Sequence, residues 1–89
     1  MISRTTNSFR KLLRHLPAEV QAAADKAYAL WQANPAHPSL DFKQVHASEP
    51  IFSARITLGW RAVGSRKPDR MVWFWVGSHN DYDRLLRQL

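Results

Sequence analysis

The sequence has no cysteine and only three glycines among its 89 residues. The absence of cysteine excludes disulfides and cysteinyl metal sites, and it fits a reducing compartment. No apolar run approaches the ~20 residues that a membrane span needs. The N-terminal stretch lacks an apolar segment of signal-peptide length. We therefore expect one soluble, cytoplasmic domain over residues 1–89, with no membrane partner.

Acidic residues are also scarce. Seven Asp and Glu face thirteen Lys and Arg, which gives a formal charge of +6, and most of the thirteen are arginines. Arginine grips phosphates with two parallel hydrogen bonds, and a basic surface attracts polyanions. The charge therefore favours a polyanionic partner, although solubility or an acidic protein partner would explain it as well.

Recognised cofactor and metal motifs are missing. His37, His46 and His79 have no ligand-like spacing, and no paired carboxylates accompany them. No glycine-rich phosphate loop and no plausible Ser-His-Asp set is present. We expect neither a metal site nor a cofactor.

The pattern of apolar residues predicts two helices, four strands and a last helix. Helical spacing of apolar residues, with Pro17 between them, predicts a hairpin of two helices, while residues 1–6 look frayed. Alternating and continuous apolar runs predict strands after it. This order is typical of an α+β fold with an antiparallel sheet. The expected helices are about Asn7 to Leu16, Ala18 to Ala33 and Ser78 to Leu89, and the strands are Leu40 to Val45, Ile51 to Leu58, Trp60 to Gly64 and Met71 to Val76.

The junction between the last strand and the last helix is the first candidate for chemistry. The run of residues 71–76 predicts a strand buried on both faces, and Ser78 is a typical helix N-cap with Asp81 in the acidic position of a capping box. This places His79 in the first turn and Tyr82 one turn further on the same side. A histidine there is suited to proton transfer near neutral pH. Alternatively, Tyr82 only packs and His79 only hydrogen-bonds locally.

A second group of candidates is basic. Arg55 lies in the middle of a predicted strand on a polar face, suited to binding a phosphate or simply exposed to solvent. A two-residue loop at residues 58–59 would place Arg61 opposite Ile56, whereas a three-residue loop would align it with Arg55. Lys43 and His46 follow the first strand, where either can extend a basic face.

Several segments together resemble the RelE/ParE superfamily of toxins from type II toxin–antitoxin pairs. They are the helical hairpin Phe9 to Asn34, the Pro-x-x-Pro-Ser-Leu segment Pro35 to Leu40, Ser-Ala-Arg-Ile-Thr-Leu-Gly-Trp-Arg-Ala from Ser53 to Ala62, and Trp-Phe-Trp-Val-Gly-Ser-His-Asn-Asp-Tyr-Asp from Trp73 to Asp83. The resemblance implies an N-terminal helical hairpin packed on a curved antiparallel four-stranded sheet and followed by a short C-terminal helix. It also implies an antitoxin partner.

RelE-type members are mRNA endonucleases that act on or off the ribosome, and ParE-type members poison DNA gyrase. The resemblance therefore implies either an mRNA interferase that inhibits translation, or a gyrase-binding or inactive interaction protein. In the first case Arg55, Arg61, His79 and Tyr82 would be catalytic, and Lys43 and His46 would bind RNA. A plain nucleic-acid-binding module is a third alternative.

Overall fold

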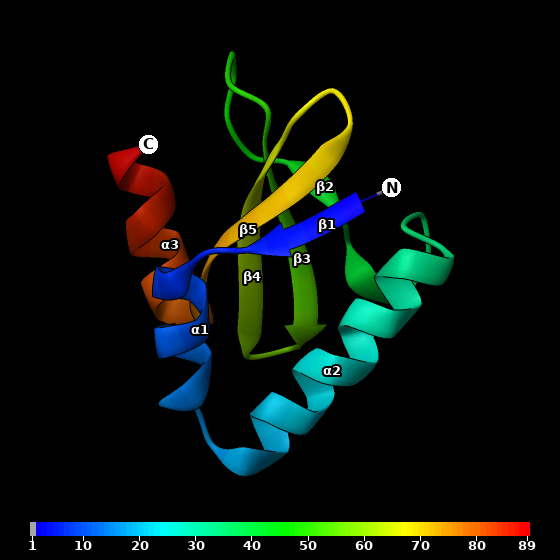
Figure 1. Ribbon diagram of the computed structural model, residues 1–89. Coiled ribbons are helices and arrows are strands. Elements are labelled where there is room, and N and C mark those ends of the chain that lie inside the picture. Colours follow the sequence, from blue (N-terminus) through cyan, green and yellow to red (C-terminus); the bar gives the residue numbers. More distant parts are fainter. Residues whose placement is uncertain (1) are drawn as a thin grey trace.

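A computed structural model describes residues 2–89 of the chain (Figure 1). It confirms an α+β fold. The helices are α1 (Asn7–Arg14), α2 (Ala18–Ala33) and α3 (His79–Gln88), with a 3₁₀ turn η1 (Pro38–Leu40), and the strands are β1 (Ile2–Thr5), β2 (Lys43–Gln44), β3 (Ile51–Thr57), β4 (Trp60–Arg66) and β5 (Arg70–Ser78). Among these residues, no helix has both the length and the apolar character that crossing a bilayer requires.

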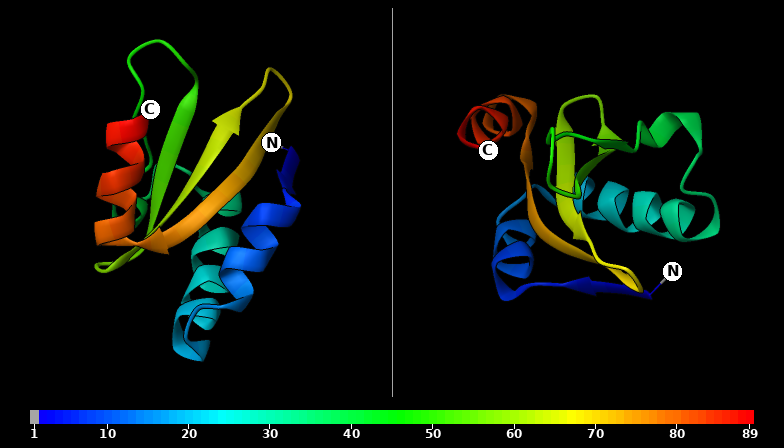
Figure 2. Two further views of the ribbon diagram at one scale, coloured as in Figure 1. Left: turned by 90° about the vertical axis from the view of Figure 1, so that its left-hand side faces the viewer. Right: turned by 90° about the horizontal axis from the view of Figure 1, so that it is seen from above.

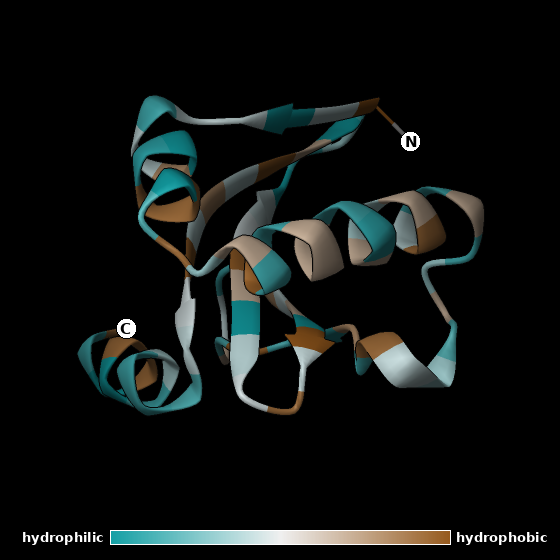
Figure 3. Cartoon of the chain, turned by 90° about the horizontal axis from the view of Figure 1, so that it is seen from below, coloured by the Kyte–Doolittle hydropathy of each residue, from teal (hydrophilic) through white to brown (hydrophobic). Residues whose placement is uncertain are grey.

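The five strands form one sheet in the order β1-β5-β4-β3-β2, in which only the β1–β5 pair is parallel. Helices α1 and α2 pack on one face of this sheet, chiefly against β5 and β3 respectively. The strands separate α2 from α3 (Figure 2). Helices α1 and α3 carry both polar and apolar residues, as expected for helices with one face on a sheet (Figure 3).

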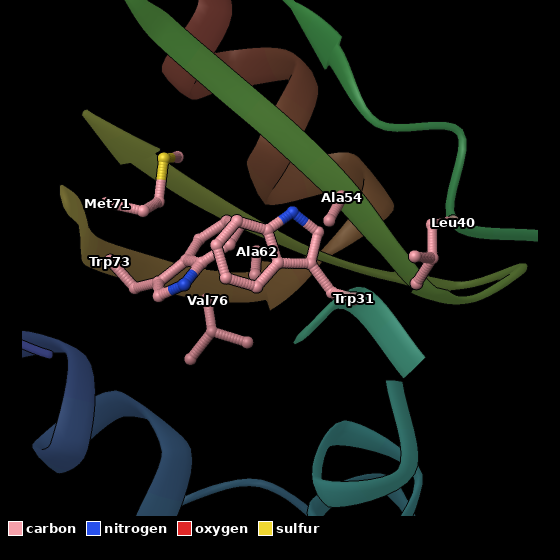
Figure 4. Packing of buried hydrophobic residues seen from close by; sticks show 7 residues of the cluster. All are labelled: Trp31, Leu40, Ala54, Ala62, Met71, Trp73 and Val76. Carbon is pink, nitrogen blue, oxygen red and sulfur yellow. The ribbon is translucent and has the colours of Figure 1, made fainter. Parts of the chain in front are cut away.

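Aromatic rings dominate the core between the sheet and the first two helices (Figure 4). Trp31 of α2 meets Trp73 of β5 edge to face, with ring centroids 5.3 Å apart, and contacts Phe42 at 5.8 Å. Large rings in such contacts supply much of the apolar burial that a chain of this size needs. The core residues are Trp31, Leu40, Ala54, Ala62, Met71, Trp73 and Val76.

The N-terminal segment corrects the sequence-based expectation. Residues 1–6 were expected to fray, but Ile2–Thr5 form β1, which pairs in parallel with residues 70–73 of β5; Met1 lies outside the described residues. The sheet therefore has five strands and one parallel pair, rather than four antiparallel strands. The strand covers an edge of β5 that would otherwise leave its backbone groups open. The paired residues lie far apart in the sequence, so no local sequence pattern predicts this pairing.

The first predicted strand is shorter than expected. Of residues 40–45 only Lys43–Gln44 form β2, because Leu40 ends a 3₁₀ turn and Asp41 has a left-handed backbone with φ of 43°. Leu40 is 1% exposed. Because its side chain packs in the core, residues 40–42 do not join the sheet.

The run of residues 71–76 is covered on both sides, and no residue from 71 to 78 is exposed. Its alternation is interrupted, because Trp73 pairs with Gly64 and Trp75 with Val63, which leaves Phe74 as an extra residue. Trp73 consequently joins the core. The ring of Trp75 lies over Gly77, and Gly77 is the residue that pairs with Arg61 of β4.

Candidate functional site

A β-bulge brings Arg55 and Arg61 to the same face of the sheet. The β3–β4 loop has two residues, since Thr57 pairs with Trp60, but the register then shifts so that Arg61 pairs directly with Arg55. Ile56 is the extra residue. The loop has two residues, yet Arg61 is aligned with Arg55 as a three-residue loop would place it, because the bulge compensates for the short loop.

Three cations of this face converge on one oxygen atom. Asp41 Oδ2 lies 2.7 Å from Arg61 Nη2, 3.3 Å from Lys43 Nζ and 3.7 Å from Arg55 Nη2. Lys43 reaches the group because it pairs with Ser53 in the neighbouring strand. The hydrogen bonds from Arg61 and then Lys43 hold the pKa of Asp41 below its ordinary value. The carboxylate therefore stays charged at neutral pH.

Arg61 is buried, unlike Lys43 and Arg55. It is 5% exposed, and its guanidinium contacts Asp41, lies 3.5 Å from Ser53 Oγ through Nη1 and covers the ring of Tyr82 at 5.2 Å. A buried guanidinium needs a carboxylate and hydrogen-bond acceptors to offset its loss of water. Asp41 and Ser53 supply these, and the aromatic face adds a cation–π contact.

Helix α3 is capped by one contact and fixed to the same face by two others. The Ser78 hydroxyl accepts a hydrogen bond from the amide of Asp81, as predicted for the N-cap. The amide of His79 donates to the carbonyl of Gly59 in the β3–β4 turn at 2.8 Å. The Tyr82 hydroxyl donates to Ser53 Oγ at 2.9 Å, where both residues are buried. These contacts place His79 at the end of the sheet where Arg55 and Arg61 lie.

His79 is accessible and oriented. Its side chain is 47% exposed, Nδ1 lies 3.3 Å from Asp83 Oδ2, and its ring meets the ring of Tyr82 edge to face at 5.8 Å. In the tautomer that keeps the proton on Nδ1, facing Asp83, the neutral ring carries its lone pair on Nε2. Among residues 2–89, no side chain or backbone group hydrogen-bonds that nitrogen. His79 can therefore accept or donate a proton at Nε2.

His46 lies apart from this group. Its Nδ1 accepts hydrogen bonds from the amides of Ser48 and Glu49, so the ring proton resides on Nε2, which donates to the carbonyl of Leu89 at 3.0 Å. Both ring nitrogens are thus engaged in holding the loop after β2 against the end of α3.

Sequence reasoning missed Asp41, Ser53 and Asp83. Asp83 follows His79 by four residues, a spacing that brings two helical side chains together, so its role was readable from the sequence. Asp41 and Ser53 carry no such signal, because their partners are distant in sequence and meet them only after the bulge sets the register. We define the basic face as Lys43, Ser53, Arg55, Arg61, His79 and Tyr82 with the carboxylate of Asp41.

Together these features describe a small α+β domain with a basic face built across two strands and the start of the last helix. The profile of the ParE-like toxin domain matches residues 18–84, and the chain belongs to this family, within the RelE/ParE superfamily of toxins. No curated protein shows significant sequence similarity to it.

Solved structures of similar fold agree with this assignment. A chain of the RelB–RelE antitoxin–toxin complex from Methanococcus jannaschii aligns with a TM-score of 0.72 and 17% identity, covering 90% of this chain and 95% of that one. YafQ from E. coli strain BL21(DE3) aligns at 0.70 and 12%, covering 90% and 94%. The RelBE2 toxin–antitoxin complex from Mycobacterium tuberculosis aligns at 0.70 and 22%, covering 88% and 96%. These likenesses show the fold.

Proposed function

We propose that the protein is the toxin of a type II toxin–antitoxin pair and that it cleaves mRNA without a metal ion. The observation that carries this proposal is the basic face itself. An exposed imidazole beside Asp83 is linked to the cations of Arg55, Arg61 and Lys43 through the ring of Tyr82, which contacts both His79 and Arg61. A proton-transfer group beside several cations is what attack on a phosphodiester requires.

Cleavage of this kind begins with the 2′-hydroxyl of a ribose. His79 Nε2 accepts the proton of this hydroxyl, whose oxygen then attacks the adjacent phosphorus. Arg55 and Lys43, which are partly exposed, contact the phosphate as negative charge builds on its oxygens. The bond to the 5′-oxygen breaks as that oxygen takes a proton from water, which leaves a 2′,3′-cyclic phosphate and a 5′-hydroxyl, and His79 then returns its proton to the solvent.

Arg61 and Tyr82, which are both buried, support this reaction. Arg61 adds its charge to the phosphate site from a buried position, and Tyr82 positions both Arg61 and His79 through its ring. The remaining arginines contribute salt-sensitive affinity for the RNA backbone. His46 and Lys43 extend the surface that RNA contacts, His46 chiefly by holding the loop in place.

The proposed partners follow from the family. RelB–RelE of Methanococcus jannaschii and RelBE2 of Mycobacterium tuberculosis were both solved as toxin–antitoxin complexes. We propose an antitoxin partner for this chain and action in the cytoplasm on mRNA, free or on the ribosome. An antitoxin with an acidic segment would complement the +6 charge.

The test is RNA cleavage by the purified chain in EDTA, with and without ribosomes. Changing His79→Ala removes the proton-transfer group, so the cleavage rate falls by about 10²–10⁴-fold. His15→Ala is the matched control, because His15 is also exposed and makes a local hydrogen bond to the carbonyl of Lys11. It leaves the rate unchanged.

The competing function is gyrase binding, which the resemblance to ParE-type toxins favours. It predicts that the wild type inhibits DNA supercoiling by gyrase and leaves RNA intact. Undiminished RNA cleavage by His79→Ala would remove His79 from the mechanism.

A further inference from the structure

The phosphate site of the basic face already holds an anion that belongs to the chain. Lys43, Arg55 and Arg61 all approach the same oxygen of Asp41. Three cations around one oxygen is an arrangement suited to a phosphate oxygen. Here a carboxylate occupies the point where the three charges meet.

The backbone of Asp41 is held on both sides. Leu40 is buried in the core, and the ring of Phe42 stacks on Phe52 at 5.1 Å. The amide of Asp41 also donates to the carbonyl of Pro38 at 3.2 Å. Its left-handed conformation, uncommon for a residue with a side chain, persists because these neighbours fix it. Asp41 therefore does not leave the site by opening of the loop.

The three cations are held unequally. Arg61 is buried at 2.7 Å from the carboxylate and depends on it as a counter-ion. The side chains of Arg55 and Lys43 are 35% and 53% exposed and lie further away, at 3.7 and 3.3 Å. Ion pairs with such exposure are weak and exchange readily with other anions. Arg61 is thus the permanent partner of Asp41, and Arg55 and Lys43 are exchangeable ones.

We propose that Asp41 is a built-in competitor for RNA phosphate at Arg55 and Lys43, an inference that rests on the proposed RNA-cleaving function. A phosphodiester binds by drawing these two side chains away from the carboxylate, which remains close and repels it. Asp41 thereby keeps the buried Arg61 in place and limits how tightly the free protein holds RNA.

Binding is measured separately from cleavage with a fluorescently labelled 2′-O-methyl RNA oligonucleotide, which has no free 2′-hydroxyl to attack. Fluorescence anisotropy gives its dissociation constant for the full chain. Asp41→Asn keeps the shape of the side chain and tolerates the left-handed backbone. Because it removes a like charge within a few ångströms of the bound phosphate, we expect roughly tenfold tighter binding.

Asp69→Asn is the matched control. It causes the same change in net charge at an exposed residue that, within residues 2–89, pairs only with the adjacent Arg70, at 3.1 Å. We expect it to tighten binding by less than about twofold, since exposed charges away from the site are screened by salt. Equal gains from the two variants would mean that net charge alone sets the affinity, and would overturn the proposal.

Asp41→Asn leaves the buried Arg61 without its counter-ion, which can destabilise the fold. The double variant Asp41→Asn/Arg61→Met avoids this effect, because it leaves no buried charge without a partner. It removes Arg61 and its counter-ion together, so its net charge equals that of the wild type, and it frees Arg55 and Lys43. We therefore expect it to bind the oligonucleotide more tightly than the wild type but less tightly than Asp41→Asn, which keeps the charge of Arg61. Weaker or unchanged binding in folded variants, as judged by circular dichroism, would overturn the inference. Tighter binding without cleavage of unmodified RNA by any variant would instead refute the proposed nuclease and leave the competition intact.

Discussion

The hydrogen bond between Tyr82 and Ser53 is the contact that fixes α3, and with it His79, to the sheet. It joins two buried hydroxyls at 2.9 Å, with Ser53 fully buried and Tyr82 4% exposed. Changing Tyr82→Phe leaves the Ser53 hydroxyl only the longer hydrogen bond from Arg61 Nη1, at 3.5 Å, and Ser53→Ala leaves the Tyr82 hydroxyl without its acceptor. Each change therefore lowers the free energy of unfolding by about 1–2 kcal/mol.

The two changes are not additive. Once one hydroxyl is gone, removing the second relieves an unpaired buried group, so the double variant loses about 1 kcal/mol less than the sum of the single losses. Urea unfolding followed by tryptophan fluorescence gives all four free energies. Tyr28→Phe is the control, because Tyr28 is 38% exposed and its hydroxyl accepts an exposed hydrogen bond from Gln32. It changes stability by less than about 0.5 kcal/mol.

Coupling below about 0.3 kcal/mol would show that the two hydroxyls act independently. The reasoning that fixes His79 over the sheet would then be wrong. The same variants report on function, since Tyr82→Phe keeps the ring that contacts Arg61 and His79.

Three further outcomes are expected. Gly64→Ala destabilises by about 1–3 kcal/mol, because a Cβ atom would lie 2.9 Å from the carbonyl oxygen of Val72, whereas Gly59→Ala is neutral in urea unfolding because its Cβ would meet nothing within 4 Å. The pKa of Asp41 is lowered in the fold, so its stabilisation is present above the unfolded pKa and is lost as the pH falls through the folded value. In acid titrations below about pH 5, the wild type therefore loses more stability than Asp41→Asn, and parallel curves would contradict this. Asp83→Ala removes the group that orients His79 and slows RNA cleavage on the order of tenfold. An unchanged rate would mean that Asp83 has no part in orienting His79.

Much of the fold was predictable because its signals are local. Pro17 separates the first two helices, and Ser78 caps the last one, as their residue types indicate. Strand β1 was not predictable, because its partner lies about 70 residues away and its four residues carry no distinct pattern. The bulges at Ile56 and Phe74 are likewise set by pairing across the sheet.

Only some members of the candidate site were predictable. Arg55, Arg61, His79 and Tyr82 were recognisable from residue type and position, and the structure brings them to one face of the sheet. The burial of Arg61 was not recognisable, because it depends on a counter-ion from a loop whose left-handed residue interrupts the predicted strand.

Analysis of the RNA ends left by the purified chain in EDTA tests the central claim most directly. Attack by the 2′-hydroxyl with His79 as base predicts fragments ending in 2′,3′-cyclic phosphate and 5′-hydroxyl groups, formed by the wild type and not by His79→Ala. Fragments with 5′-phosphate ends, or intact RNA together with inhibited gyrase, would contradict it.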